Sequence, residues 1–305
     1  MHKSGAIIVT SNQRNEETKM KNIKKLLALA LAVLFVLSMA ACGGNSDSKV
    51  TAKVINIPLS SEEYAFAVNP SDAELLTSVN NFLAEIKSNG KYDEVISHYF
   101  GEGSPVEIES ATEDSSKDQL VVVTEPGFEP FEYTSGNKYV GIDMEFAKML
   151  ADYLGKELVI KSIDFDTIFE TLNTGGADVG MAGITIKEDR KLLVSFSDPY
   201  YNAAQNLIVK SNNDKFNDCK TKEDVDKILQ SFGSDVKIGV QNGTTGDFYV
   251  EGDDDFGFAK LNVTKVGFSN GSLAVTAMLN GDVDYVIIDE APAQCITKAI
   301  NKING

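Results

Sequence analysis

The sequence predicts an α/β protein of two lobes, and two observations carry that prediction. From residue 120 to residue 182, apolar runs of strand length alternate with stretches of helical periodicity. After a polar segment at 211–234, the same alternation is repeated as far as residue 300. Alternating strands and helices are typical of a parallel sheet covered by helices, and two such runs indicate two lobes.

The first run begins with a buried strand at 120–124. A helix at 142–154 is indicated by Phe146, Met149 and Leu150, which recur at helical spacing. The other elements expected in this run are a helix at 166–173 and strands at 157–163 and 178–182.

The second run is introduced by a strand at 206–210 and by a helix at 223–232 in the polar segment. Its expected strands are 236–240, 263–268 and 283–288, and its expected helices are 245–250, 272–279 and 291–300.

The residues before the first run carry elements of their own. Ser71 and Glu74 have the spacing of a capping box, which opens a helix that ends at Asn89 and Gly90. The other elements expected here are strands at 54–57 and 63–68, a short helix that stops near Gly101, and a polar linker at 102–118.

Composition narrows the classes of function. The chain has 305 residues, a net charge of −17 and no tryptophan. An acidic surface argues against nucleic acid or anionic lipid as partners. Histidine occurs only at His2 and His98, so we expect no histidine-based metal or catalytic centre and no other cofactor.

The N-terminus predicts export. Three lysines precede an apolar run at 26–39, which is followed by Ala40, Ala41 and Cys42. This order is typical of a signal peptide at 1–41, with Met20 as the better start. A cysteine after two small residues resembles a bacterial lipobox, which implies a lipid on Cys42 and a polar tether at 42–49. A membrane-spanning helix, the alternative, needs about 20 apolar residues.

Two further cysteines remain, Cys219 and Cys295. An oxidising exterior permits a disulfide between them, but sequence alone does not show whether their Cα atoms come within bonding range. Both a disulfide and two free thiols stay open.

The stretch from Met181 to Arg190 has the residues of a cradle for a small carboxylate. Gly183 permits a close approach to the backbone, Thr185 offers a hydroxyl, and Arg190 offers a planar fork for two oxygens. The alternative is a surface charge beside an ordinary turn.

A second cradle follows another apolar run at 241–246, and it contains Gln241 and Thr245. A lone acid, Asp289, follows a third run. In parallel sheets, ligands lie beyond the carboxyl ends of the strands. Residues that follow strands of both lobes are therefore expected to face one cleft: Glu125, Phe128, Phe165, Gly183, Thr185, Arg190, Gln241, Thr245 and Asp289.

These motifs resemble the amino-acid-binding proteins of ABC importers, in the branch that takes polar and basic amino acids. The matching pieces are Thr124–Tyr133, Gly141–Asp143, Ala182–Thr185 with Arg190, Phe196–Tyr201, Gly239–Gly246 and Asp289–Ala291. They extend over most of residues 118–305. The resemblance implies a two-lobed, Venus-flytrap fold of the periplasmic-binding-protein-like II type.

The order of the pieces departs from that family. Its usual C-terminal strand, two helices and Tyr-Phe-Gly ending resemble residues 50–101, which here come first. We expect a circular permutation in which the linker joins the family's usual termini. One lobe would comprise 66–202, and the other 50–65 plus 203–305. An unrelated N-terminal module is the alternative.

The resemblance implies a role for each residue of the cleft. Arg190, with Thr185 and Thr245, would hold the ligand carboxylate, and Asp289 with the Gly183 carbonyl would hold its ammonium group. Phe128 and Phe165 would sandwich the ligand side chain, or serve as core aromatics. Glu125 and Gln241 would face its polar end, or solvent.

The resulting expectation is a monomeric lipoprotein on the outer face of a bacterial cell membrane. It would capture a basic or polar L-amino acid, arginine or lysine first, and deliver it to an ABC permease. Two alternatives remain. A same-fold enzyme would act as a dehydratase of cyclic acids, which prephenate or arogenate turnover would reveal. A sensor would need a receptor as its partner.

Overall fold

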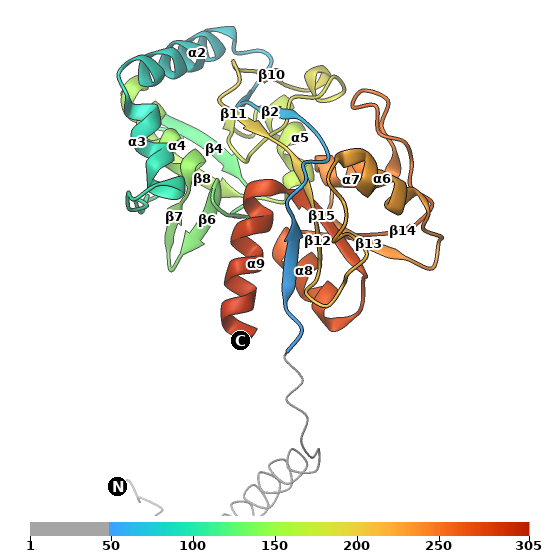
Figure 1. Cartoon of the computed structure of the whole chain (residues 1–305). Helices are drawn as coiled ribbons and strands as arrows, with labels where there is room; N and C mark the ends of the chain where they lie inside the picture. Colours follow the sequence, from blue (N-terminus) through green and yellow to red (C-terminus); the bar gives the residue numbers. More distant parts are fainter. Residues whose placement is uncertain (1–48, 305) are drawn as a thin grey trace, which may run out of the picture. The chain divides into compact units, whose positions relative to one another are not determined.

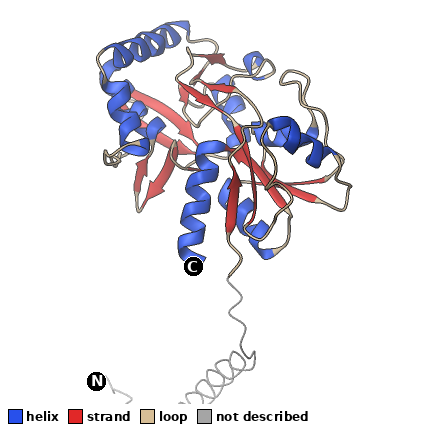
Figure 2. Ribbon diagram, in the orientation of Figure 1, coloured by secondary structure: helices blue, strands red, loops and turns tan. Residues whose placement is uncertain are grey.

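A computed structural model describes residues 49–304, in which two five-stranded mixed sheets form the centres of two α/β lobes (Figures 1 and 2). The α/β, two-lobed prediction is therefore confirmed. The expected signal peptide at 1–41, Cys42 and all but the last residue of the tether lie outside the described residues. In residues 49–304, no helix combines the length and the apolar character that crossing a membrane requires.

The first sheet has the strand order β10-β3-β9-β4-β8. Strand β4 runs parallel to its neighbours β8 and β9. Strand β3 is antiparallel to β9, and the edge strand β10 is antiparallel to β3. The strands are β3 (Ala67–Val68), β4 (Gln119–Thr124), β8 (Glu157–Ser162), β9 (Val179–Gly180) and β10 (Ser195–Phe196). The helices of this lobe are α2 (Ala73–Ser88), α3 (Lys91–Phe100), α4 (Ile142–Leu154) and α5 (Ile168–Asn173).

The second sheet has the order β1-β12-β15-β13-β14, in which β13 is parallel to both β14 and β15. The strands are β1 (Ala52–Ile55), β12 (Gln205–Lys210), β13 (Lys237–Gln241), β14 (Thr264–Phe268) and β15 (Tyr285–Asp289). The helices are α6 (Lys222–Gln230), α7 (Thr245–Glu251), α8 (Gly271–Asn280) and α9 (Glu290–Asn304).

The chain passes between the two sheets twice, and the two passages pair with each other. β2 (Glu62–Tyr64) lies between β1 and β3 in the sequence, and β11 (Tyr201–Ala203) lies between β10 and β12. β2 and β11 form an antiparallel two-stranded sheet of their own. We call this paired crossing between the lobes the hinge ribbon.

Several local predictions need correction. The cap of α2 is Asp72, whose carboxylate accepts from the Leu75 N–H at 2.8 Å, and not Ser71. The single strand expected at 63–68 is divided into β2 and β3, because the chain changes sheet there. The state of Cys219 and Cys295, which sequence left open, is that of two free thiols.

One sheet had no counterpart in the prediction. Strands β5 (Gly127–Phe128), β6 (Glu132–Ser135) and β7 (Lys138–Val140) form a three-stranded antiparallel meander directly after β4. Its strands are too short for their periodicity to stand out from the surrounding turns.

The two ends of the described chain lie side by side, as Figure 1 shows for the blue β1 and the red α9. The Asn301 side chain is hydrogen-bonded to the backbone of Ala52 in both directions, at 2.9 and 2.8 Å. Helix α9 is thereby fastened along the first strand of its sheet.

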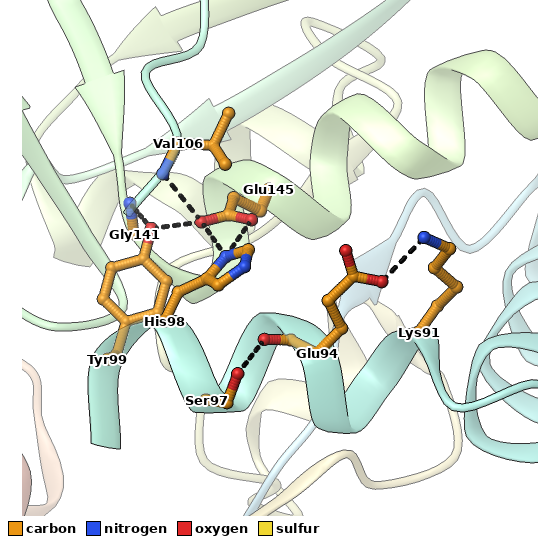
Figure 3. Close-up of polar contacts among 8 residues, drawn as sticks. All are labelled: Lys91, Glu94, Ser97, His98, Tyr99, Val106, Gly141 and Glu145. Atoms are coloured by element: carbon orange, nitrogen blue, oxygen red, sulfur yellow. Dashed lines mark hydrogen bonds and ion pairs between the residues drawn. The ribbon is translucent and has the colours of Figure 1, made fainter. Parts of the chain in front are cut away.

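The segment at 102–118, expected to be a linker, is attached to the first lobe through a buried carboxylate (Figure 3). Glu145 on α4 accepts hydrogen bonds from Tyr99 Oη at 2.7 Å and from the Val106 N–H at 3.1 Å, and it lies 2.8 Å from His98 Nδ1. Ile108 then pairs with Tyr139 of β7 and is buried. The segment is irregular in secondary structure but packed against the lobe.

Replacing Glu145 by alanine should destabilise the first lobe. The change leaves the Tyr99 hydroxyl and the Val106 N–H without their acceptor, which costs about 1 to 3 kcal/mol of unfolding free energy. Urea denaturation measures that loss. Glu94→Ala is the matched control, because Glu94 is an exposed acid of α3 that pairs with exposed Lys91 (Figure 3). This variant should leave stability unchanged. Equal stability of the two variants would contradict this account.

Candidate functional site

A cavity of about 270 Å³, counting the space open to solvent, lies between residues of the two lobes. It sits at the carboxyl ends of the central strands, where the sheet topology places ligand sites. Its lining residues are Phe128, Glu132, Phe165, Ala182, Gly183, Thr185 and Arg190 from the first lobe, and Gln241, Thr244, Thr245 and Asp289 from the second.

Arg190 is the central cation of this cavity. It opens a short 3₁₀ turn, Arg190–Leu192, and is 5% exposed. Its Nη1 donates to the Thr185 carbonyl at 2.6 Å, and its Nη2 donates to the Gly243 carbonyl at 2.7 Å. Because Gly243 belongs to the second lobe, the guanidinium bridges the cleft.

Aromatic rings surround the guanidinium. Its central carbon lies 4.7 Å from the ring centre of Phe169, 5.4 Å from that of Phe165 and 5.6 Å from that of Phe248. Burial lowers the pKa of Arg190 to about 10, so the group is still charged at neutral pH. Two of its five N–H donors are engaged by carbonyls. The remaining donors suit a carboxylate.

Thr185 and Thr245 meet across the cleft, with their hydroxyl oxygens 3.3 Å apart. Thr185 Oγ1 also donates to Glu62 Oε2 at 2.8 Å. Glu62 belongs to the hinge ribbon, is 4% exposed, and accepts from Gln205 Nε2 at 3.1 Å. A buried acid therefore stands directly behind the two threonines.

Asp289, the last residue of β15, supplies the opposite charge. It is 4% exposed and accepts a hydrogen bond from the Tyr64 hydroxyl. Burial and the neighbouring carboxylate of Glu62 both raise the pKa of Asp289. A cationic group in the cavity would reverse that effect, because an opposite charge favours the ionised form.

Gly183 and Phe128 form the floor of the cavity by close contact. Gly183 has φ +52°, and a Cβ at this position would lie 2.8 Å from Phe128 Cε1. The Gly183 N–H donates to the buried carboxylate of Asp143 at 2.9 Å, which holds the turn in place. Only glycine fits here, because both the backbone angle and the ring exclude a side chain.

Glu125 does not line the cavity, but it contacts Gln241, which does. Its Oε2 accepts from Gln241 Nε2 of the second lobe at 3.1 Å. Burial raises the pKa of Glu125 to about 7. Gln241 itself lines the cavity and is 2% exposed, and its Oε1 has no hydrogen-bond partner within 49–304.

The predicted residues thus come together, with one difference in placement. Of the nine, all but Glu125 line the cavity, and Glu125 contacts one that does. Sequence analysis missed Glu132 on the wall and Glu62 and Tyr64 behind it. The only available signal was that Glu132 lies in the Thr124–Tyr133 motif, whereas nothing links Glu62 or Tyr64 to residues more than a hundred positions away.

A charged contact outside the cavity also crosses between the lobes. Lys187 of the first lobe lies 3.0 Å from Asp253 Oδ2 and 3.3 Å from Asp255 Oδ2 of the second, and its side chain is 5% exposed. Its other partner is Asp189, at 2.8 Å on its own lobe. Together with Arg190 and Thr185, this contact shows the lobes closed on each other.

Residues 120–280 match the profile of the bacterial extracellular solute-binding proteins, family 3. The chain belongs to this family. The family consists of solute-binding proteins, which agrees with the expectation that this chain is a binding protein and not an enzyme. With the two mixed sheets, it gives the chain the type II periplasmic-binding-protein fold.

Individual relatives of this family 3 protein carry names that describe them as amino-acid-binding proteins. A probable histidine-binding protein of Neisseria gonorrhoeae is 32% identical over 174 residues, which are 56% of this chain and 58% of that protein. The chain thus spans little more than half of that relative's length. A glutamine-binding protein of an ABC transporter from Bacillus subtilis is 30% identical over 273 residues, 88% of this chain and 76% of that protein.

A solved structure is also similar. An ancestral arginine-binding protein bound to arginine is 37% identical, with a TM-score of 0.52 over 62% of this chain and 77% of that one.

The titration of Glu125 predicts how stability changes with pH. The folded protein holds this proton more tightly than the unfolded chain, where glutamate has a pKa near 4.3. The stability due to Glu125 is therefore present below about pH 4 and lost as the pH rises to about 7. Relative to Glu125→Gln, the wild type should lose at most about 1.4 kcal/mol of unfolding free energy per pH unit over this window.

Urea denaturation of both proteins from pH 4 to pH 8 measures this difference. Glu107→Gln changes an exposed acid and should follow the wild type at every pH. Parallel curves for Glu125→Gln and the wild type would show that Glu125 does not titrate in this range.

Proposed function

We propose that this family 3 protein binds a basic L-amino acid, arginine or lysine, and delivers it to the membrane subunits of an ABC importer. One observation carries the proposal: Arg190 and Asp289, one buried charge of each sign from each lobe, line the same cavity. An α-amino acid has one group of each sign on a single carbon. The names of the histidine- and glutamine-binding relatives, and of the arginine-bound structure, support an amino acid as the ligand.

Each of the nine predicted residues then has a role. The ligand carboxylate would take the remaining donors of Arg190 and the hydroxyls of Thr185 and Thr245. Its ammonium group would pair with Asp289 and the Gly183 carbonyl. Its side chain would extend over the other lining residues toward the cavity edge, where Phe128, Phe165, Gln241 and Glu125 would surround it.

Delivery would depend on closure. A ligand that contacts both lobes stabilises the closed form by its differential contacts, and the closed form is the one a permease would recognise. Arg190, held by carbonyls of both lobes at once, supports this coupling.

The protein would act outside the cytoplasm as a monomer, held to the membrane by a lipid on Cys42. The signal-like N-terminus and the cysteine after two alanines support this anchoring. Mass spectrometry of the mature protein would detect the lipid, and an unmodified Cys42 would contradict the anchor.

Calorimetric titration with the twenty amino acids tests the binding function. Arginine and lysine should bind, and Arg190→Lys should weaken arginine binding by about ten- to a hundredfold, because lysine lacks the planar fork. Lys191→Gln, which alters a neighbouring exposed charge, should leave the affinity unchanged. Binding confined to leucine or valine would reject a basic ligand.

We also propose that the chain is a circular permutation, with lobes at 66–202 and at 50–65 plus 203–305. Residues 50–101 support it, because they supply β1 to one sheet and β3, α2 and α3 to the other lobe. A reordered chain, with 119–304 first and 50–101 joined after it by a short linker, should fold and bind the same amino acid within about threefold, since Ala52 and Asn301 are already in contact. Circular dichroism and calorimetry measure both. An unfolded product would contradict the permutation.

A further inference from the structure

A charged side chain outside the cavity has no role in the function proposed above. Lys187 lies three residues before Arg190 in the sequence, and its side chain is 5% exposed. Its Nζ atom lies 3.0 Å from Asp253 Oδ2 and 3.3 Å from Asp255 Oδ2, and both aspartates belong to the second lobe. A lysine so deeply enclosed is rare, because its ammonium group loses water on burial and must find other partners.

The two aspartates lie in a short turn of the chain at 253–258, which we call the acidic hairpin. The Asp253 N–H donates to the Phe258 carbonyl at 2.9 Å, and the Phe258 N–H donates back to the Asp253 carbonyl at 2.8 Å. The Phe256 N–H donates to Asp253 Oδ1 at 3.1 Å. The hairpin backbone therefore fixes one oxygen of this carboxylate and leaves the other, Oδ2, to Lys187.

Lys187 stays charged in these surroundings. Burial acts to lower its pKa, but its hydrogen bonds to Asp189, Asp253 and Asp255 outweigh burial and raise the pKa above the ordinary value. Its Nζ atom also lies over the ring of Phe248, 5.1 Å from the ring centre. An ammonium group over an aromatic face gains further attraction. The cation is thus stabilised by the second lobe as well as by its own.

Helix α7 connects the acidic hairpin to the cavity. Its first residue, Thr245, lines the cavity, and its last, Glu251, is separated from the hairpin by one glycine. The ring of Phe248, on the same helix, lies 5.6 Å from the guanidinium carbon of Arg190 as well as close to Lys187. A ligand that engages Arg190 and Thr245 therefore holds α7, and the hairpin behind it, against Lys187.

Opening of the lobes would break part of this arrangement. Asp189 is on the same lobe as Lys187, so that pair, at 2.8 Å, can persist. Asp253, Asp255 and the ring of Phe248 belong to the second lobe and would withdraw. Contacts that exist in only one of two states favour that state, which here is the closed form. Because these contacts join protein groups alone, they act with or without a ligand.

We propose that Lys187 and the acidic hairpin form a latch that holds the lobes closed and sets the rate at which the ligand leaves. The inference rests on the amino-acid-binding function proposed above. It assigns the control of release to a residue outside the cavity, whereas the cavity residues recognise the ligand. Loss of the latch should therefore change dissociation much more than association.

Release of radiolabelled arginine, followed by rapid filtration after a chase with unlabelled arginine, tests the latch. Lys187→Gln should release arginine about ten- to a hundredfold faster than the wild type, because the enclosed aspartate loses its counter-charge. Its association rate should change by less than about threefold. Lys187→Arg keeps the charge and should retain most of the slow release. Asp254→Asn is the matched control, because it removes an exposed acid of the same hairpin, and it should release arginine at the wild-type rate.

The same latch can be broken from the other lobe. Replacing Asp253 and Asp255 together by asparagine should accelerate release as Lys187→Gln does. Adding Lys187→Gln to this double variant should cause little further acceleration, because the contact is already lost. If the two accelerations multiplied instead, Lys187 and the hairpin would act separately, and the proposal would be overturned. Agreement between variants on opposite lobes also shows that fast release is not the misfolding of one of them.

Small-angle X-ray scattering of the protein without arginine gives a second readout. Lys187→Gln should have a larger radius of gyration than the wild type, because more of its molecules are open, and Asp254→Asn should match the wild type. Wild-type release by Lys187→Gln, or equal radii for the two proteins, would overturn the latch. If the wild type bound no amino acid, the proposed function itself would fail, and the radii would still decide whether Lys187 holds the lobes together.

Discussion

The site depends on the burial of one guanidinium. Arg190 is almost inaccessible to solvent, and it is tolerated there because two carbonyl oxygens and three phenyl rings replace the water it loses. The carbonyl of Gly243 comes from the second lobe, so this arrangement is complete only when the lobes are closed. The same side chain that offers donors to a carboxylate therefore also responds to the position of the other lobe.

Among the described residues, acidic side chains outnumber basic ones in and around the cavity. Asp289 and Glu132 line it with Arg190, while Glu62 and Glu125 lie in contact with its wall. Where water is scarce, charges interact over longer distances than at a surface. Such a cavity favours a ligand with more positive than negative groups. The net charge of −17 acts in the same direction at long range, since it attracts cations from solution.

The hinge ribbon and the site share residues. β2 pairs with β11 where the chain crosses between the lobes, and the two ends of β2 both contact the cavity wall. Glu62 accepts from Thr185, and the Tyr64 hydroxyl donates to Asp289. A movement of the ribbon would change both contacts, so the opening of the lobes and the electrostatics of the cavity are physically linked.

The amino-acid sequence by itself determined the α/β class, the two lobes and most of the candidate site. Strand and helix periodicity are local properties, and glycine, threonine, arginine and aspartate after apolar runs indicate their chemistry at the place where they occur. The short meander, the division of 63–68 between two sheets and the cap at Asp72 were decided by packing. The partners of Glu62, Tyr64 and Glu132 were decided by the tertiary structure alone. These contacts join residues from separate elements, and the environment that leaves Glu132 without a partner exists only after both lobes have folded.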